Sequence, residues 1–168
     1  MTVFNQFDNM TYVAENRFML AAISEAVSAQ TRGDYAIGAV VVRNNEIIAA
    51  SGNRIKQDTD PTQHAEVAAL RFACRKLNTR HLEGCVLYTT HEPCPMCASA
   101  AIWARLAGVV SGGTIADMAS FCSQYGNQDW SWRTISMPAK SVLAVGDPKL
   151  FLIEQFMRKE CLQLFHSS

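Results

Sequence analysis

Apolar and polar residues in the first third of the chain follow two different periods. Between Met10 and Gln30 the apolar residues recur at helical spacing, which predicts an amphipathic helix. The stripe that this helix would bury consists of Met19, Ile23 and Val27. Arg32-Gly33 is expected to end the helix, because glycine readily adopts the left-handed conformation that follows a helix.

Two β-prone runs come next, from Ala36 to Val42 and from Glu46 to Ala50. The pair Asn44-Asn45 between them favours a tight turn, so the two runs predict a β-hairpin. Asp60-Pro61 then opens a predicted helix that runs to about Leu77. Aspartate can cap the free amides of a helix, and proline is tolerated at the first helical position.

The second half of the chain alternates strands with helices. The predicted elements are a strand from Cys85 to Thr90, a helix from Cys94 to about Leu106, a strand from Gly108 to Gly113, a helix or loop, a strand from Ser141 to Val145, and a last helix from Asp147-Pro148. The apolar stripe of the last helix is Leu150, Ile153, Met157, Cys161 and Leu164. This alternation predicts an α/β sandwich with a largely parallel sheet in its second half. Residues 1–168 contain no repeat or linker and are expected to form a single domain.

The charge balance and the lack of a visible leader limit the partners and the cellular compartment that we expect. The 15 lysines and arginines balance 15 aspartates and glutamates, which argues against a long polyanion as partner, although a local basic patch stays open. Neither a secretory leader nor a long apolar span is visible, which favours a cytoplasmic protein. In that reducing compartment cysteines are more often metal ligands than disulfide partners.

Two short segments carry the candidate chemistry, His64-Ala65-Glu66 and Pro93-Cys94-Pro95-Met96-Cys97, each at the start of a predicted helix. Cys94 and Cys97 are one helical turn apart, so both sulfurs can face one ion, and the helix N-terminus favours their thiolate form. With a nitrogen from His64, three ligands leave one position of a tetrahedral zinc free. We expect one zinc ion per chain, with a water or hydroxide at that position.

Two of the other cysteines are too far along their elements to fill the fourth position, whereas Cys122, Cys161, His81 and His166 stay open as candidates. Cys74 is about 15 Å from His64 along the same predicted helix, and Cys85 is about 17 Å from the far end of its strand. His91 is near enough to matter and is expected at the rim of the pocket, with a plain surface histidine as the alternative. Glu66 is expected to accept and return the proton of the bound water. A closed zinc site in a non-catalytic binding module is the alternative, and it leaves Glu66 without a task.

The pattern H-x-E followed by P-C-x-x-C is the signature of zinc deaminases. Together with Gly38-Ala39-Val40, Asn53 and Asp60-Pro61-Thr62, it makes residues 36–113 resemble the cytidine-deaminase-like superfamily, in particular the branch of bacterial guanine deaminases and tRNA adenosine deaminases. The resemblance implies a three-layer α/β/α sandwich with a five-stranded mixed sheet, usually in a homodimer. It also implies a hydrolytic enzyme in which Glu66 is the catalytic acid and base. Such an enzyme replaces an amino group on a nucleobase or nucleoside ring with an oxo group and releases ammonia.

The residues predicted to contact the substrate are Asn53, Ile37, Ala65, Trp103 and His91. Asn53 resembles the family's asparagine that holds the base by its amide. Trp103 matches the aromatic position of guanine deaminases, where tRNA adenosine deaminases tend to have histidine; packing in the core is the alternative. Ile37 stands where guanine deaminases have a phenylalanine against the base. We expect a guanine-type purine as substrate, with tRNA adenosine or a cytosine-type ring as alternatives.

Beyond Gly113 the resemblance fades. The aromatic residues of segment 121–133 match no motif and predict packing, a dimer contact or a lid over the pocket. The last helix carries Lys149, Arg158 and Lys159 beside two glutamates, which is a weak sign of tRNA binding. The cysteines outside the motif are predicted to be buried thiols, namely Cys74, Cys85, Cys122 and Cys161.

Overall fold

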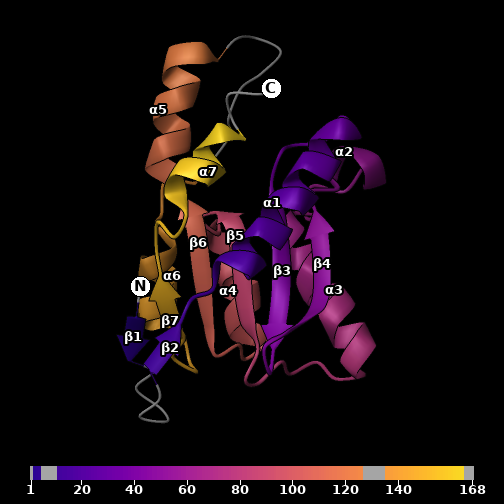
Figure 1. Cartoon of the computed structure of the whole chain (residues 1–168), viewed down its shortest axis with the longest axis vertical. Coiled ribbons are helices and arrows are strands. Elements are labelled where there is room, and N and C mark those ends of the chain that lie inside the picture. The colour runs from indigo at the N-terminus through magenta and orange to yellow at the C-terminus, as the bar shows by residue number, and fades with distance from the viewer. Residues whose placement is uncertain (1, 5–10, 127–134, 165–168) are drawn as a thin grey trace.

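The computed structural model describes residues 2–4, 11–126 and 135–164. Its central sheet consists of β3 (Gly38–Arg43), β4 (Glu46–Gly52), β5 (Val86–His91), β6 (Gly108–Gly113) and β7 (Phe151–Ile153). These five strands lie in the order β4-β3-β5-β6-β7 (Figure 1). β3 is antiparallel to β4 and β5, whereas β5, β6 and β7 run parallel. The mixed five-stranded sheet and its parallel second half are therefore confirmed.

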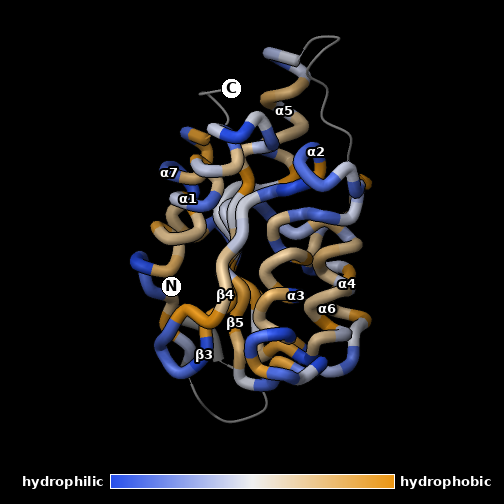
Figure 2. Tube along the Cα trace, turned by 90° about the vertical axis from the view of Figure 1, so that its right-hand side faces the viewer, coloured by the Kyte–Doolittle hydropathy of each residue, from blue (hydrophilic) through white to orange (hydrophobic). Residues whose placement is uncertain are grey.

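Helices cover both faces of this sheet and complete the three predicted layers (Figure 2). One face is covered by α1 (Asn16–Thr31) and α7 (Arg158–Gln163), and the other by α3 (Ala65–Leu77), α4 (Pro95–Trp103) and α6 (Ala139–Val145). The short α2 (Ile55–Asp58) follows β4, and α5 (Ile115–Tyr125) follows β6 and projects beyond the sheet (Figure 1). In the described ranges, no helix has the length and apolarity that a bilayer span requires.

The β3–β4 hairpin turns at Asn44 and Asn45, as predicted. Their φ angles are 49° and 65°. Two consecutive positive φ angles belong to a type I′ turn, whose twist matches that of the flanking strands, and asparagine tolerates this region better than most residues. The turn sets the pairing of Arg43 with Glu46, and an irregularity between Val41 and Val42 then shifts the register by one residue, so that Gly38 lies opposite Gly52.

The buried strand β5 and the small residues of its covering helices set the position of the site. All six residues of β5 are buried because it lies in the middle of the sheet. Leu87 packs on one face with alanines of α3 and α4, and Tyr88 packs on the other face with Phe18. Alanine side chains such as Ala69 and Ala98 let α3 and α4 approach each other closely. The two helix N-termini are therefore brought together.

The first helix begins later than its periodicity predicts. It starts at Asn16, and the preceding β2 (Thr11–Val13) pairs antiparallel with β1 (Thr2–Phe4). The run threonine-tyrosine-valine favours extended backbone, and this preference outweighs the apolar spacing. The predicted stripe is partly wrong: Met19 is buried, but Val27 is exposed, and the helix buries alanines against the sheet instead.

The helix predicted from Asp60-Pro61 ends at Leu77 as expected, but its predicted start is wrong. The helix begins at Ala65. Residues 60–63 form a turn in which the Asp60 carboxylate accepts hydrogen bonds from the Thr62 backbone N–H at 2.8 Å and from the Thr62 hydroxyl at 2.7 Å. Asp60 therefore caps a turn rather than a helix, a common task for aspartate.

Two predictions near the C-terminus are wrong in type. The strand predicted at Ser141–Val145 is the helix α6, and the long last helix predicted from Asp147-Pro148 is replaced by β7 and the short α7. The run Phe151-Leu152-Ile153 pairs in parallel with β6. Aromatic and β-branched residues fit the half-buried surface of a sheet, so completing the sheet edge overrides the helical spacing.

Candidate functional site

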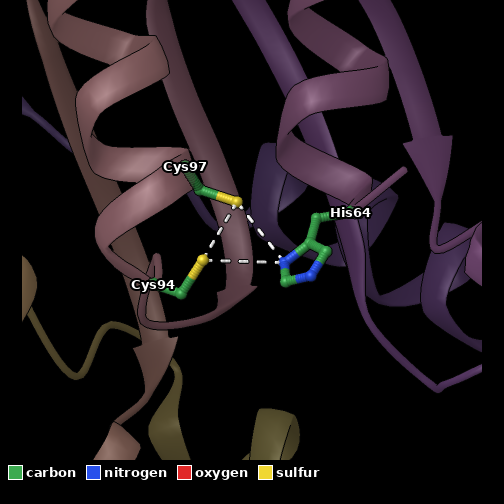
Figure 3. A group of neighbouring side chains, drawn as sticks. All are labelled: His64, Cys94 and Cys97. Carbon is green, nitrogen blue, oxygen red and sulfur yellow. Dashed lines mark hydrogen bonds between the residues drawn. The ribbon is translucent and has the colours of Figure 1, made fainter. Parts of the chain in front are cut away.

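The two motif segments lie side by side at the N-termini of α3 and α4. His64 is the residue before α3 and Cys94 is the residue before α4, and neither uses its side chain to cap its own helix. Pro95 occupies the first position of α4, where its missing N–H costs no hydrogen bond. Figure 3 shows that the side chains of His64, Cys94 and Cys97 converge from the two helix ends.

The spacing of these three side chains fits a zinc ion. The two sulfurs are 3.6 Å apart, and His64 Nδ1 lies 3.7 Å from Cys94 Sγ and 3.5 Å from Cys97 Sγ. Ligands in a tetrahedron with Zn–S of about 2.3 Å and Zn–N of about 2.0 Å are separated by about 3.8 Å between sulfurs and about 3.5 Å between sulfur and nitrogen. Thiolate and imidazole donors also suit zinc chemically.

The electrostatics of the two thiols point to a cation. The hydrogen bond with Cys97, together with His64, lowers the pKa of the Cys94 thiol to about 4. The hydrogen bond with Cys94, together with burial, raises the pKa of the Cys97 thiol, because a second negative charge beside the Cys94 thiolate is unfavourable. The hydrogen bond with Cys94 raises the pKa of His64. A divalent cation among these groups would remove the conflict between the two thiolates.

Glu66 lies in the first turn of α3 beside the three ligands. Its side chain is only 3% exposed, and this burial raises its pKa from 4.5 to about 7. Its carboxyl group interacts with Cys97, but it is not part of the group of ligand atoms. A carboxyl group with a pKa near neutrality can take up and release a proton under physiological conditions.

A fourth protein ligand is not found near this group in the part of the chain that the structure describes. Cys74 and Cys85 lie outside the cluster, as the distances along their elements predicted. His91 is buried at the end of β5, and its Nδ1 lies 2.9 Å from the Glu92 carbonyl oxygen. Burial lowers the pKa of His91 and favours the neutral ring. The surface alternative for His91 is therefore wrong, and its contact with substrate stays a prediction.

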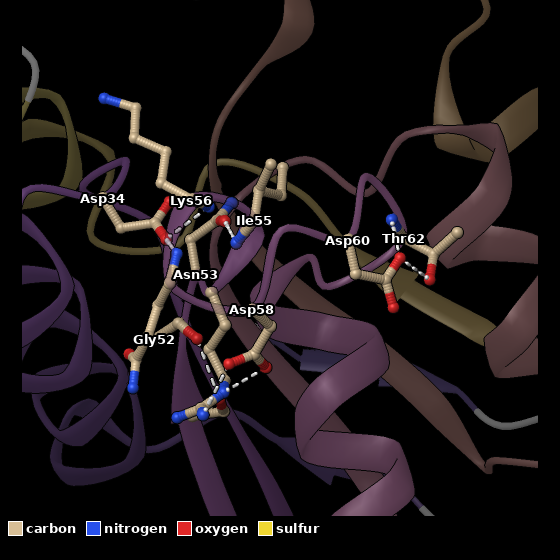
Figure 4. Close-up of polar contacts among 11 residues, drawn as sticks. Asp34, Gly52, Asn53, Ile55, Lys56, Asp58, Asp60 and Thr62 are labelled. Carbon is tan, nitrogen blue, oxygen red and sulfur yellow. Dashed lines mark hydrogen bonds and ion pairs between the residues drawn. The ribbon is translucent and has the colours of Figure 1, made fainter.

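Three of the predicted substrate contacts are buried residues, and two of them, Ile37 and Ala65, belong to one core cluster. Asn53 follows β4 and is 1% exposed; its N–H donates to the Ile37 carbonyl at 2.8 Å. Its side-chain oxygen accepts a hydrogen bond from the Ile55 N–H at 3.0 Å (Figure 4), which leaves its two amide N–H groups to offer a ligand. Ile37 and Ala65 are buried. The Arg54 N–H donates to the Gln63 carbonyl at 3.0 Å and ties the Asn53 loop to the residue before His64.

Trp103 is not brought to the metal ligands within this chain. It ends α4 at the opposite end from Cys94, and its side chain is 82% exposed. The alternative of core packing is therefore wrong, and the predicted substrate contact stays a prediction. Trp103 lines a groove of about 850 Å³ between α3 and α4, together with Arg71, Arg75, Arg80 and Arg105.

The structure also shows two buried carboxylates that the sequence interpretation left without a task. Glu92 accepts hydrogen bonds from the Ile115 N–H at 2.9 Å and the Ala139 N–H at 2.8 Å. It thereby joins the first residues of α5 and α6 to the loop that carries Cys94. The position of Glu92 between a buried strand and a proline is the sequence feature that could have predicted a buried, hydrogen-bonded carboxylate. Asp34 follows the glycine that ends α1, and only the structure reveals its contacts.

The predictions for the aromatic segment 121–133 and for the four cysteines outside the motif have different outcomes. Phe121 and Tyr125 pack against each other on α5, with ring centroids 4.8 Å apart. The predictions for Trp130, Trp132 and Arg133 lie outside the described residues. Cys85 and Cys161 are buried thiols as predicted, whereas the prediction is wrong for Cys74 and Cys122, which are only half-buried.

Comparison with known proteins places these residues in a family. Residues 13–112 match the family model of the cytidine and deoxycytidylate deaminase zinc-binding region. A tRNA-specific adenosine deaminase of Aquifex aeolicus is 44% identical over 93 residues, which cover 55% of this chain and 62% of that protein. A guanine deaminase of Bacillus subtilis is 48% identical over 81 residues, which cover 48% of this chain and 51% of that protein. These matches span less than two thirds of either relative.

Solved structures of the same two classes share the fold. One, from studies of A-to-I editing by tRNA:A34 deaminases, superposes with a TM-score of 0.71 at 31% identity over 89% of this chain and 99% of that chain. The guanine deaminase of Bacillus subtilis gives a TM-score of 0.61 at 32% identity over 74% of this chain and 87% of that chain. The family match includes His64, Cys94 and Cys97, and with their spacing it confirms zinc as the cofactor. The chain belongs to the family of the cytidine and deoxycytidylate deaminase zinc-binding region.

Proposed function

We propose that this chain is a zinc-dependent hydrolytic deaminase, which replaces the amino group of a nucleobase-type ring with an oxo group and releases ammonia. The observation that carries the proposal is the buried Glu66 carboxyl group beside the three zinc ligands. Burying an ionisable group costs stability, and a purely structural zinc site has no use for one. The non-catalytic binding module therefore leaves this feature unexplained.

Each residue of the site has a task in this reaction. Zinc, when bound, supplies the Lewis acid that activates a water molecule near neutral pH. Glu66 takes a proton from that water onto its carboxylate and donates it to the ring nitrogen next to the reacting carbon. Glu66 then passes the second proton of the water to the amine that leaves as ammonia, and the oxygen of the water remains on the ring. Burial, which raises the pKa of Glu66, suits a group that must both accept and donate a proton.

The neighbouring residues would hold the ring. The amide N–H groups of Asn53 would donate to acceptor atoms of the base, since its side-chain oxygen is already engaged by Ile55. Ile37 and Ala65 offer buried apolar surface against which a flat ring can pack. His91, neutral and buried, would lie behind this pocket at the end of β5.

A guanine-type purine is the proposed substrate. The aromatic Trp103 supports it, because it matches the guanine deaminase pattern. A guanine deaminase is also among the relatives, at an identity that tRNA-specific adenosine deaminases share. Guanine also presents ring-nitrogen and carbonyl acceptors to the amide N–H groups of Asn53.

Adenosine in tRNA is the second candidate, and a basic groove favours it. Four arginines line the groove beside the exposed Trp103, against a single acidic residue, Asp147. The net charge of the whole chain is zero, so these cations form a local patch. Arginines next to an exposed aromatic ring can bind single-stranded RNA through phosphate contacts and base stacking. Gel retention of tRNA over a salt series, with Arg75→Ala and Arg80→Ala, would separate this candidate from the first.

The proposal is tested by ammonia release from guanine, adenine, cytosine, their nucleosides and tRNA. We expect turnover of guanine, a loss of at least about a hundredfold in Glu66→Gln, and unchanged zinc content in that variant. Glu46→Gln is the control, because Glu46 is an exposed residue of the β3–β4 hairpin. Full activity of Glu66→Gln would contradict the mechanism, and turnover of tRNA alone would select the second candidate.

The predicted homodimer is part of the proposal. Trp103 at the end of α4 and Val145 at the end of α6 expose large apolar side chains, and Gly146 packs against Ile102 between them. Such residues are typical of protein contacts, so a second copy of the chain would cover them. Analytical ultracentrifugation of wild type and Trp103→Ala would test this. The cytoplasmic location stays a prediction from the sequence.

A further inference from the structure

Asp34 is a buried carboxylate in the loop between α1 and β3, outside the proposed chemistry. Its side chain is only 6% exposed. One carboxylate oxygen accepts a hydrogen bond from the Tyr35 N–H at 2.9 Å. The other accepts hydrogen bonds from the Lys56 N–H at 2.9 Å and the Gln57 N–H at 3.2 Å. A buried carboxylate is tolerated when it is hydrogen-bonded in this way, and such charge-assisted bonds are the strong ones.

These bonds let Asp34 cap a helix from another part of the chain. Lys56 and Gln57 are the second and third residues of α2, whose N–H groups have no partner inside the helix. The residue before the helix, Arg54, makes no side-chain cap. A helix of four residues is not stable alone, so its position depends on contacts such as these. The Lys56 ammonium also lies 4.9 Å from the centre of the Tyr35 ring and joins the same two loops.

The carboxylate closes a ring of hydrogen bonds that runs through two candidate substrate contacts. The Ile37 N–H donates to the Tyr35 carbonyl at 2.8 Å, and the Asn53 N–H donates to the Ile37 carbonyl at 2.8 Å. The Ile55 N–H donates to the side-chain oxygen of Asn53 at 3.0 Å. The N–H groups of the next two residues of α2 donate to Asp34 and complete the ring. Figure 4 shows Asp34, Asn53 and Ile55 close together.

We infer that Asp34 is a positioning residue for substrate binding: it holds α2 so that Ile55 fixes the Asn53 amide, and it holds the loop that carries Ile37. This inference rests on the proposed function, because it assigns Ile37 and Asn53 to the ring of the substrate. Asp34 touches neither the substrate nor the zinc ligands. Its loss should therefore weaken substrate binding and leave the chemical step nearly intact.

The test uses Asp34→Asn in the zinc-loaded chain of residues 1–168. The variant keeps the size of the side chain but replaces one acceptor oxygen with an NH₂ group, so that either Tyr35 or the pair Lys56 and Gln57 loses its acceptor. We expect KM for the ring substrate to rise about tenfold, from the loss of charge-assisted hydrogen bonds, with kcat within about twofold and zinc content unchanged. Asp58→Asn is the matched control, because Asp58 also belongs to α2 and is exposed, but its carboxylate pairs with Arg54 and not with the Asp34 loop. Its KM should stay within about twofold of wild type.

A double-mutant cycle separates positioning from general stability. If Asp34 acts partly through Asn53, then Asp34→Asn should raise KM clearly less in an Asn53→Ala background than in the wild type, with the remainder acting through the loop that carries Ile37. Should Asp34→Asn fail to fold, Asp34→Glu replaces it; the longer side chain keeps the charge but displaces α2, and KM should still rise. An unchanged KM, an equal rise in Asp58→Asn, or additive effects with Asn53→Ala would overturn the inference. Absence of deamination by the wild type would instead refute the proposed function, and this inference with it.

Discussion

Gly38→Ala is the substitution whose effect the structure defines most sharply. Gly38 is the first residue of β3 and lies directly against α1. A Cβ atom at this position would lie 2.0 Å from the Ala22 carbonyl oxygen and 2.5 Å from the Ala26 nitrogen, whereas ordinary contacts start at 3.4 Å. Both obstacles are backbone atoms of a helix, so neither can rotate away. The strand and the helix would have to separate by about 1 Å or more.

The cost follows from what α1 covers. The helix packs on β3, β4 and β5 and buries Phe18 and Met19 against the sheet, so a separation loosens the whole layer. Overpacking a core usually costs about 1–3 kcal/mol, and a clash between two backbones belongs at the upper end, about 3 kcal/mol. The Gly38 N–H also donates to Thr90 Oγ1 at 3.1 Å, so the shift would disturb the end of β5 that leads to Cys94.

The assay is urea unfolding followed by circular dichroism, with Gly33→Ala as the control. At Gly33 an added Cβ meets nothing within 4 Å, but the φ of +81° makes any side chain unfavourable, by about 1 kcal/mol. We expect Gly38→Ala to lose clearly more free energy of unfolding than Gly33→Ala. Equal losses in the two variants would show that the contact between α1 and β3 does not limit the stability of this fold.

Three further changes have defined outcomes. Burial alone would raise the pKa of Asp117, but its hydrogen bonds with Arg158 and Thr114 lower it below 3.8. The ionised carboxylate therefore stabilises the fold above that pH, and this stability is lost as pH falls through the folded pKa. Asp117→Asn should flatten the acid side of a plot of free energy of unfolding against pH. Removal of zinc by a chelator should lower Tm by several degrees, and stoichiometric zinc should restore it in a calorimetric scan; an unaffected Tm would count against the metal centre. Leu87→Ala empties a fully buried position in β5 and should cost about 2–5 kcal/mol in urea unfolding, while a loss under about 1 kcal/mol would mean that the core is looser than described.

The metal centre could be predicted from the sequence because its geometry is local. Cys94 and Cys97 are one helical turn apart, and a proline between them marks the helix start, so their convergence needs no knowledge of the rest of the fold. His64 and Glu66 share the first turn of α3 in the same way. The family resemblance then predicted the one contact between segments far apart in the sequence, namely that the N-termini of the two helices lie side by side.

The features that sequence reasoning missed depend on contacts between distant segments. The run at Phe151 has helical spacing and strand-forming residues, and only the free edge of β6 decides between them. The exposure of Trp103 follows from how α4 packs on the sheet, which residue spacing within α4 does not reveal. Asp34 and α2 are far apart in the sequence, so their hydrogen bonds become visible only when the α1–β3 loop meets the end of β4.

X-ray absorption at the zinc edge tests the central claim most directly. For the zinc-loaded protein we predict two sulfur ligands, the scattering pattern of one imidazole ring, and one further oxygen ligand from solvent. The Glu66→Gln variant should give the same spectrum, because the Glu66 carboxylate of the wild type is not one of the ligand atoms. A spectrum with four protein ligands, or with a second imidazole in place of solvent, would contradict the catalytic site described for this chain.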